Sequence, residues 1–375
     1  MGDLDLVAPL ASAGVKCAVV APPGDPARYS RKVDVVGWAD PQEEPDALLE
    51  LLLQYGFAQS AKPVLYFQSD EYALFVSRHR QELAAAYRVI VTDEALMVNL
   101  LDKLRFRGLA DQLGLPVPRS QLLNPMSVGA WSEIDLTFPL LIKPASRSEK
   151  RWVDLEPARK AIRVDSVKDL EGLWSQLVTF GRSVLLQELV PGPETRIESY
   201  HTYVDEHGDV IAEFTGRKLR TKPMEFGRST AIVITDASDI KELGRAITAK
   251  LELHGVAKLD FKRDADNALW LLEVNPRYTL WCHPAARAGV NIPALVWADL
   301  TGHSARQVSD FTPGIRWFSP WDLQAARLHG WSLSRWLMWA WRCETRSMMD
   351  WNDPQPFVRL CAQRVRRFRR RDRRR

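Results

Sequence analysis

The first 113 residues alternate short apolar runs, rich in β-branched and aromatic residues, with longer segments of helical spacing. The apolar runs are residues 16–21, 62–67 and 88–92, and the helical patterns between them cover residues 45–56 and 69–87. Strands that alternate with helices assemble into a parallel sheet covered by those helices. The sequence therefore predicts an α/β domain over residues 1–92.

The pattern changes after residue 93. Apolar positions keep helical spacing through 93–113, and Gly114 and Pro116 follow, so we expect a linker helix that ends there. Beyond Val117 strands predominate, and we expect an α+β domain. Its predicted strands and helices are a strand around Lys143, strands at 161–164 and 183–190, helices at 166–180 and 237–254, a hairpin spanning 197–220 with its turn at Asp205–Asp209, and a strand pair at 257–263 and 269–274.

Length and charge support this division of the chain. The 375 residues suit two or three domains, and a hydrophobic content of 46% is enough to form buried cores. The net charge is +4, but residues 364–375 hold nine arginines and one aspartate, a net charge of +8, so the remainder carries −4. We therefore divide the chain into 1–92, 93–305, and a Trp-rich helical extension with an Arg-rich tail at 306–375.

Composition also excludes several classes of protein. The four cysteines form no CxxC pair and the histidines form no HExxH motif, which argues against a disulfide framework and against a zinc site. No run of 18 apolar residues is present, and the first 15 residues carry two aspartates and no basic residue, unlike a signal peptide. A cytoplasmic protein is the expectation.

The strongest chemical signal lies in the last predicted strand pair. Alternate residues of a strand share a face, so Glu273, Asn275 and Arg277 project together, and hairpin pairing places Asp260 beside them. Oxygen ligands of this kind suit Mg²⁺ that is held partly by substrate phosphates. The alternative is an ordinary surface hairpin, which explains one carboxylate more easily than this spaced set.

Five motifs in order give the chain a recognisable resemblance. They are DKLRF (102–106), LLIKP around Lys143, QELVPGPE (187–194), KLDF (258–261) and LEVNPR (272–277). Together they resemble the ATP-grasp superfamily, and more narrowly its carboxylate–amine ligase group, which includes D-aspartate ligase. SDEYALFVSRHRQEL (69–83) and GRKLRTKP (216–223) add to the resemblance, which runs over about residues 15–302. It implies a pre-ATP-grasp α/β domain followed by a two-lobed ATP-grasp domain.

The resemblance also implies a nucleotide site. Lys103 and Lys143 would reach the phosphates of ATP, and Lys143 stands at the end of an apolar strand, where its ammonium would be held as a point charge. Lys103 could equally be a solvated lysine on the polar side of its helix. Glu188 and Leu189 would lie at the adenine, and Glu194, within one or two positions, would accept from the ribose hydroxyls.

The metal site follows from the same resemblance. Asp260, Glu273 and Asn275 would hold Mg²⁺, with Mn²⁺ as an alternative ion, and Arg277 would stabilise charge on the transferred phosphoryl group.

The basic run GRKLR supplies the remaining candidates. Lys218 or Arg217 is favoured to contact an acyl phosphate or an acidic substrate, which Arg220 would also suit, while a solvated basic edge is the competing interpretation. Arg196 and His201 are substrate-side candidates, and His201 also suits a purely structural place in its strand.

Two features depart from the ATP-grasp pattern. Residues 144–171 hold no glycine, so Ser146, Arg147, Ser148 and Lys150 would have to replace the backbone donors of a glycine-rich lid. The chain also starts almost inside its first helix, and we expect a shortened or reduced first domain.

The function expected from these motifs is an ATP-dependent ligase that joins a carboxylate to an amine of small-molecule or peptide substrates. The alternative is an ATP-binding protein without ligase activity that serves regulation or scaffolding, or a partner of membranes or nucleic acid. Five tryptophans between 331 and 351 adjoin the Arg tail, which suits an anionic membrane at the inner face of the cell membrane. They could instead pack the extension against the body, because RWLMWAWRC is apolar nearly all round. Sequence-specific nucleic-acid binding is not expected, and oligomerisation is left open.

Overall fold

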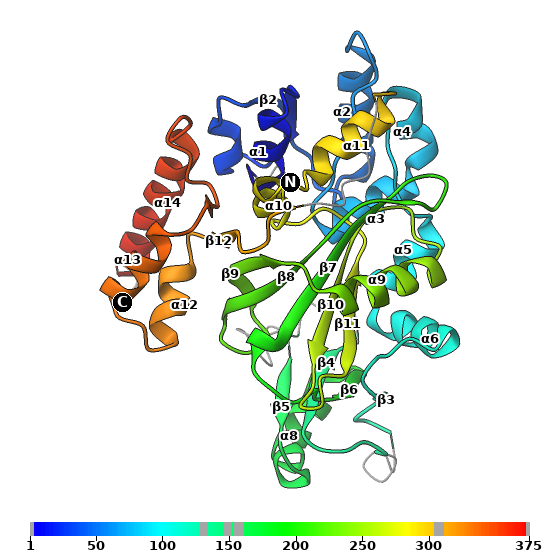
Figure 1. Cartoon of the computed structure of the whole chain (residues 1–375). Helices are drawn as coiled ribbons and strands as arrows, with labels where there is room; N and C mark the ends of the chain where they lie inside the picture. The colour runs from blue at the N-terminus through cyan, green and yellow to red at the C-terminus, as the bar shows by residue number, and fades with distance from the viewer. Residues whose placement is uncertain (1–3, 128–133, 146–151, 153–160, 304–310, 373–375) are drawn as a thin grey trace.

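The computed structural model describes residues 4–127, 134–145, 152, 161–303 and 311–372 of the chain. Among these residues the strands form a two-stranded, a four-stranded and a seven-stranded sheet. The seven-stranded sheet lies at the centre of the molecule, the four-stranded sheet lies at one end of it, and the N-terminal helices lie at the other (Figure 1). The last three helices form a separate group at the side. This mixed α/β architecture agrees with the predicted fold class.

The N-terminal part is mostly helical. Its elements are α1 (Leu4–Ser12), β1 (Cys17–Val20), the 3₁₀ helix η1 (Pro26–Tyr29), β2 (Val33–Gly37), α2 (Pro45–Phe57), α3 (Asp70–Arg78) and α4 (Arg80–Ala86). β1 and β2 pair in parallel, as predicted for an α/β domain, although β2 was not foreseen. The predicted helix 69–87 is divided at His79.

The other two strands predicted in this domain do not form. Residues 62–67 and 88–92 meet only in an isolated parallel bridge between Val64 and Arg88. The Arg88 amide donates to the Pro63 carbonyl at 2.9 Å and the Leu65 amide donates to the Arg88 carbonyl at 2.9 Å. Pro63 has no N–H, so it can accept but cannot donate to a ladder on that side. The prediction of further strands in this sheet was wrong.

The predicted linker helix is also divided. It forms α5 (Glu94–Leu101) and α6 (Lys103–Leu113), with Asp102 between them in an extended conformation. The Asp102 carboxylate accepts from the Leu104 and Arg105 amides at 3.0 Å, a side-chain N-cap that starts a new helix. The amphipathic spacing continues across the break, which is why periodicity alone predicted one helix. As a result, Lys103 is the first residue of α6.

The four-stranded sheet forms a small lobe. Its strands are β3 (Ser120–Leu123), β4 (Leu140–Pro144), β5 (Ile162–Val164) and β6 (Val184–Glu188), in the antiparallel order β3-β6-β4-β5. α8 (Val167–Phe180) covers it, and Leu170 and Leu177 of this helix share a core with Ile142 and Leu186 of the sheet. The lobe thus holds β4 and β6 side by side, with their ends toward the larger sheet (Figure 1).

The seven-stranded sheet has the order β11-β10-β7-β8-β9-β12-β13. Its central elements are η2 (Glu194–Arg196), β7 (Ile197–Val204), β8 (Val210–Lys222), β9 (Arg228–Thr235), α9 (Ser238–Lys250), β10 (Gly255–Arg263), β11 (Leu269–Asn275), α10 (Cys282–Ala288) and α11 (Ile292–Leu300). β7 pairs antiparallel with β8, and β10 pairs antiparallel with β11, which confirms both predicted hairpins. Two apolar cores cover the two faces of the sheet, one containing Tyr200 and Leu259 and the other Phe214 and Trp317.

The C-terminal extension continues this sheet. It comprises β12 (Arg316–Phe318), α12 (Asp322–Leu328), α13 (Leu333–Trp341), β13 (Thr345–Arg346) and α14 (Gln355–Asp372). β12 pairs with β9, and α14 returns to the N-terminal part, where the Arg359 guanidinium lies 4.4 Å from the Tyr29 ring centroid. Among the described residues, the helices are too short or too polar to cross a membrane.

The tryptophans of the extension do not behave alike. Phe318 packs against Trp336 and Trp339 at 5.7 and 5.8 Å between ring centroids, so part of the cluster does join the extension to the body. Trp341 and Trp351, in contrast, are 85% and 91% exposed. The interpretation of RWLMWAWRC as a buried helix was wrong, because one face of α13 has no described residue packed over it to bury it.

One N-terminal carboxylate joins the two ends of the chain. Asp5 is completely buried and accepts hydrogen bonds from the Trp317 indole N–H, at 3.0 Å, and from the Ser347 hydroxyl. The His283 Nδ1 lies 2.9 Å from the same carboxylate. α1, α10 and the extension are therefore held around a single side chain.

We expect Asp5→Ala to lower the free energy of unfolding by about 3 kcal/mol, because it leaves buried donors of Trp317 and Ser347 without an acceptor. Urea unfolding followed by tryptophan fluorescence measures this loss. Glu206→Ala is the matched control, since the Glu206 side chain is 82% exposed and its loss should cost under about 0.5 kcal/mol. Equal losses in the two variants would contradict the structural role of Asp5.

Candidate active site

A pocket lies between the small lobe and the large sheet. Its polar lining comes from Lys103 and Arg107 of α6, Ser120 of β3, Lys143 of β4, Gln187 of β6 and Glu273 of β11. Its remaining lining is apolar and includes Leu100, Phe106, Val117, Leu185 and Leu271. The fold thus brings both predicted phosphate lysines and one predicted metal ligand to one apolar-walled cavity, the usual composition of a small-molecule site.

Both lysines of this pocket are held by the small lobe. The Lys103 ammonium donates to the Pro144 carbonyl at 3.0 Å, and the Lys143 ammonium donates to the Gln187 side-chain carbonyl at 2.6 Å. Lys143 therefore stands on a rigid strand end, as expected. Gln187 was not singled out from the sequence, although it is the first residue of the QELVPGPE motif. The break at Asp102 is what aims Lys103 at the end of β4.

Glu188 and Leu189 lie immediately after Gln187, at the end of β6. The Glu188 carboxylate accepts from the Thr137 amide at 2.9 Å and from Arg119 at 3.3 Å, and the Leu189 amide donates to the Pro139 carbonyl at 2.9 Å. These groups are thus committed to holding the β6 end against the preceding loop. The adenine role of both residues stays a prediction.

The predicted metal ligands meet on the β10–β11 hairpin. Asp260 is paired with Glu273 in the register, and the Asn275 amide donates to Glu273 Oε1 at 3.1 Å. All three present oxygen atoms, the donor chemistry that Mg²⁺ prefers. Within the described residues no cluster of three or more His, Cys, Asp or Glu could hold an ion, so the set depends on Asn275 as its third member. The residues fit a hard divalent ion, and their metal role stays a prediction.

Two lysines flank Asp260 in the interior. The Lys258 ammonium lies 2.8 Å from Asp260 Oδ2, the Lys218 ammonium lies 3.7 Å from the same oxygen, and the Ser199 hydroxyl donates to Oδ1. Burial lowers the pKa of Lys258, and Asp260 only partly offsets it. Burial also disfavours the charged form of Lys218, but attraction to the carboxylates of Asp260, Glu273 and Glu194 is stronger than this effect and raises the pKa of Lys218.

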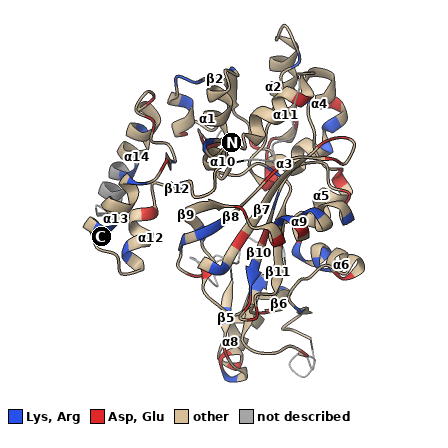
Figure 2. Cartoon of the chain, viewed as in Figure 1, with Lys and Arg blue, Asp and Glu red and all other residues tan. Residues whose placement is uncertain are grey.

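Lys258 was not predicted as a site residue. Its signal was present in the KLDF motif, because a residue two positions before Asp260 shares its face of the strand. Lys218, in contrast, was predicted, and the structure places it beside the metal candidates. Figure 2 shows how basic and acidic residues gather along the strands of the central sheet.

Glu194 faces the same group of charges from η2. Burial raises the pKa of Glu194, while Lys218 and Lys262 act in the opposite direction. Burial in turn lowers the pKa of Lys262, with Glu194 opposing this shift. The carboxylate is therefore close to Lys218 and Lys262, and its predicted contact with a ribose stays a prediction.

Arg277 connects the hairpin to the N-terminal part. Its Nε lies 2.6 Å from Asp70 Oδ1, and its Nη2 lies 3.5 Å from Asn275 Oδ1. Asp70 opens α3, whose N-cap is Ser69. Burial lowers the pKa of Arg277, with Glu273, Glu71 and Asp260 opposing this shift. Asp70 is thus a residue of the site that was quoted in the SDEYALF motif but not given a role.

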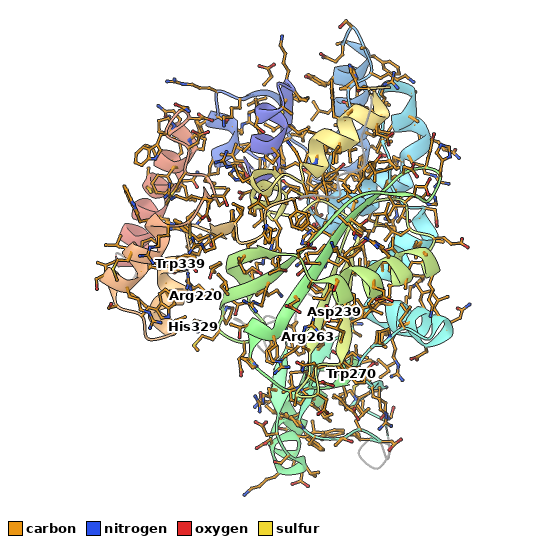
Figure 3. All side chains as sticks on the ribbon, in the orientation of Figure 1. Arg220, Asp239, Arg263, Trp270, His329 and Trp339 are labelled. Carbon is orange, nitrogen blue, oxygen red and sulfur yellow. The ribbon has the colours of Figure 1, made fainter. Side chains whose placement is uncertain are left out.

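Arg220 does not belong to this site. It is buried and makes a bidentate ion pair with Asp322 of α12, with N–O distances of 2.9 and 2.6 Å. Its guanidinium also lies 4.4 Å from the Trp331 ring centroid and 3.9 Å from that of Trp339, and Figure 3 shows Arg220 beside Trp339. The suggestion that it suits an acidic substrate was wrong, because the fold uses it to hold the extension.

The two other basic candidates, Arg217 and Arg196, have different surroundings in the structure. Arg217 is exposed on β8, and its substrate role stays a prediction. Arg196 donates to the backbone carbonyls of Arg263, at 3.1 Å, and Asp264, so its suggested substrate role is replaced by support of the hairpin turn.

His201 is completely enclosed between two aromatic rings, with centroid distances of 4.4 Å to Phe214 and 5.2 Å to Trp281. Burial lowers the pKa of His201 well below its usual range. This agrees with the structural interpretation rather than with a substrate contact. The candidate lid residues Ser146, Arg147, Ser148 and Lys150 lie outside the described residues.

Comparisons with known proteins show which proteins the chain is similar to in sequence and fold. Residues 181–319 match the family described as ATP-grasp in the biosynthetic pathway with Ter operon. D-aspartate ligase from Enterococcus faecium (strain Aus0004) is 26% identical over 285 residues, which is 73% of this chain and 68% of that enzyme. D-alanine–D-alanine ligase from Ectopseudomonas mendocina (strain ymp) is 26% identical over 53% of this chain, and the match spans just under two thirds, 64%, of that enzyme.

The fold is shared with solved structures. The ADP complex of PurK, an N5-carboxyaminoimidazole ribonucleotide synthetase, has a TM-score of 0.62 over 82% of this chain and 76% of that chain, at 13% identity. At this sequence identity the structural similarity is evidence for the fold alone. The two sequence relatives, both ligases, indicate which ATP-grasp proteins the chain resembles. The matched family model, the ligase relatives and the shared fold all support the chain's resemblance to the ATP-grasp superfamily and its carboxylate–amine ligase group, and support an enzyme that forms carbon–nitrogen bonds.

Proposed function

We propose that the enzyme activates a carboxylate with ATP as an acyl phosphate and transfers the acyl group to an amine. In the first step a carboxylate oxygen of the substrate attacks the γ-phosphorus, and ADP leaves. In the second step the amine attacks the acyl carbon, loses a proton, and expels phosphate to give an amide. Positioning and charge neutralisation drive both steps, so no side-chain nucleophile is needed.

The observation that carries this proposal is the meeting of Lys103, Lys143 and Glu273 in one pocket between two lobes. Lysines held at 3.0 and 2.6 Å by strand-end oxygens are fixed point charges, which suits the binding of a polyphosphate. The apolar walls from Leu100, Phe106 and Leu185 suit the base and sugar. Glu273 lies at the boundary between this pocket and the interior charges of the hairpin.

The hairpin would hold the metal ion. Asp260, Glu273 and Asn275 are the residues that would bind Mg²⁺, and the ion would supply charge neutralisation for the phosphate oxygens of ATP. Mn²⁺ has the same preference for oxygen ligands and is an alternative. Ser199 and Lys258 fix the orientation of the Asp260 carboxylate, so this ligand is held in place before any ion arrives.

Cations and carboxylates are interleaved around the hairpin. Lys218, Lys258, Lys262 and Arg277 face the carboxylates of Glu194, Asp260, Glu273 and Asp70. Cations held this close to the hairpin would stabilise a polyanion and the charge that develops on a transferred phosphoryl group. Lys218 and Arg277 would neutralise that charge, and Arg217, which is exposed on β8, would contact an acidic substrate.

The relatives suggest the class of substrate. D-aspartate ligase and D-alanine–D-alanine ligase are named for amino acids. We therefore infer that the carboxylate or the amine is an amino acid or a small peptide. The competing function, an ATP-binding protein without ligase activity, is disfavoured because binding alone would not require the ordered Asp260, Glu273, Asn275 and Arg277 set.

A screen for ADP release tests the proposal. Purified enzyme with MgATP should release ADP only when a productive carboxylate and amine are both present, and the product mass should equal the sum of the two substrates minus water. Panels of amino acids and dipeptides, tested in pairs, cover the inferred class. Nucleotide binding without ADP release under any pair would favour the non-catalytic function, and absence of nucleotide binding would contradict both.

A further inference from the structure

The exposed face of α13 is the most concentrated apolar surface that the fold leaves uncovered in the extension. Leu333, Leu337, Met338 and Trp341 are 45%, 53%, 64% and 85% exposed. At about 100° per residue, these four side chains occupy one arc of about 140° around the helix. Trp336 and Trp339 lie on the opposite side and Ala340 lies at its border, and these three residues share a core with Phe318 and Cys343. The helix is therefore two-sided, with one side docked and the other open.

Arginines border this open arc. Arg335 and Arg342 of the α13 segment are exposed and follow Met338 around the helix, at about 180–200° from Leu333. The apolar side chains and the guanidinium groups thus form adjacent stripes on the helix. Amphipathic helices with adjacent apolar and basic stripes bind lipid bilayers, because the apolar side chains insert at the boundary between headgroups and acyl chains while the basic side chains contact the headgroups.

The charge distribution of the chain favours an anionic lipid surface in particular. The tail from residue 364 carries a net charge of +8, while the rest of the chain carries −4, so a negative surface attracts the C-terminal end of the chain. α14 places the start of this tail in the same group of helices as α13 (Figure 1). The 91% exposed Trp351, in the segment that joins β13 to α14, adds a residue typical of membrane interfaces.

Other occupants fit these features less well. A second copy of the chain would bring two tails of +8 together, which like charges oppose. Nucleic acid would use the arginines but would leave the Leu333, Leu337 and Met338 stripe in water, since phosphate contacts need no aliphatic surface.

We propose that the open face of α13 docks the enzyme reversibly on a bilayer containing anionic lipids, with the net charge of +8 in residues 364–375 adding electrostatic attraction. The docking places the catalytic lobes beside the membrane, since the extension is joined to the central sheet by β12 and by the Arg220–Asp322 pair. This inference does not depend on the ligase reaction.

Vesicle flotation tests the surface with the full-length enzyme. We expect the protein to float with vesicles of phosphatidylglycerol mixed with phosphatidylcholine, and to stay at the bottom of the gradient with phosphatidylcholine alone. Trp341→Ser should lower the bound-to-free ratio about tenfold, because an exposed tryptophan would lose its burial in the lipid. Leu337→Ser should act in the same direction.

Controls separate the outcomes. Phe57→Ser removes a 64% exposed aromatic residue of α2, remote from the extension, and should leave flotation unchanged. Light scattering and near-ultraviolet circular dichroism establish that each variant keeps its mass and fold. The proposal is overturned by equal flotation of Trp341→Ser and the wild type, by absence of flotation with anionic vesicles, or by a dimer that Trp341→Ser dissociates. Retention on duplex DNA that vesicles do not compete away would likewise overturn it in favour of nucleic acid.

Discussion

Glu273→Gln should reduce the rate of ADP formation by on the order of 10² or more while leaving the fold intact. Glu273 is paired with Asp260 across the hairpin, accepts from the Asn275 amide at 3.1 Å, and also lines the pocket that holds Lys103 and Lys143. Glutamine keeps the size of the side chain and an oxygen acceptor but removes the negative charge that would bind the metal ion. The loss is measured as initial rate at saturating substrate once a productive pair is known.

Two measurements make this expectation specific. Asp266→Asn removes a carboxylate from the exposed turn of the same hairpin and should leave the rate unchanged. Titration of Mn²⁺ in the presence of ADP, followed by electron paramagnetic resonance, should show weaker ion binding in Glu273→Gln than in either the wild type or Asp266→Asn. An unchanged rate together with unchanged Mn²⁺ binding would remove Glu273 from the metal site.

Asp322→Ala should lower the free energy of unfolding by about 3–5 kcal/mol, the largest stability effect that we expect. Asp322 is completely buried and accepts from Arg220 through both carboxylate oxygens, from the Thr230 hydroxyl at 2.9 Å, and from the Trp336 indole at 2.9 Å. Alanine leaves the guanidinium of Arg220 buried between Trp331 and Trp339 without its counter-charge. Guanidinium chloride unfolding measures the loss.

A double variant distinguishes charge from packing in this pair. Arg220→Met with Asp322→Leu removes both charges and should recover part of the stability that Asp322→Ala loses. Asp350→Ala breaks the half-exposed pair with Lys32 and should cost no more than about 1 kcal/mol. If Asp322→Ala costs as little as Asp350→Ala, the Arg220–Asp322 pair does not hold the extension to the sheet.

The sequence was most informative where local pattern and local chemistry coincide. The β10–β11 hairpin has alternating residues and a polar turn, so its face could be predicted, and Glu273, Asn275 and Asp260 do lie together there. The Asp205–Asp209 turn of the β7–β8 hairpin was predicted because two β-rich runs flank these turn residues. In the structure the Asp205 side chain accepts hydrogen bonds from the His207 and Asp209 amides within this turn.

Prediction was weaker where a residue has two local options. Asp102 can continue a helix or cap a new one, and the helical periodicity on both sides hides the cap that the structure uses. Residues 62–67 and 88–92 have the composition of strands, but Pro63 has no backbone N–H group to donate at the bridge. Residue composition alone does not show that this hydrogen-bond donor is missing. The helical spacing on both sides of Asp102 was thus read correctly, while the break in the helix and the absence of the two strands were not predicted.

The sequence alone determined the ATP-grasp resemblance, the order of its motifs and the faces of the hairpin, because these depend on spacing along a few neighbouring residues. Only the tertiary structure decided which charges serve the site. Lys218 and Arg220 lie on β8 and Lys258 lies on β10 of the same sheet, yet Lys218 and Lys258 meet Asp260 while Arg220 meets Asp322, which is 102 residues away in the chain. The partner of a buried charge depends on which distant segment of the chain packs over it. The spacing of residues along the sequence does not show which segment that is.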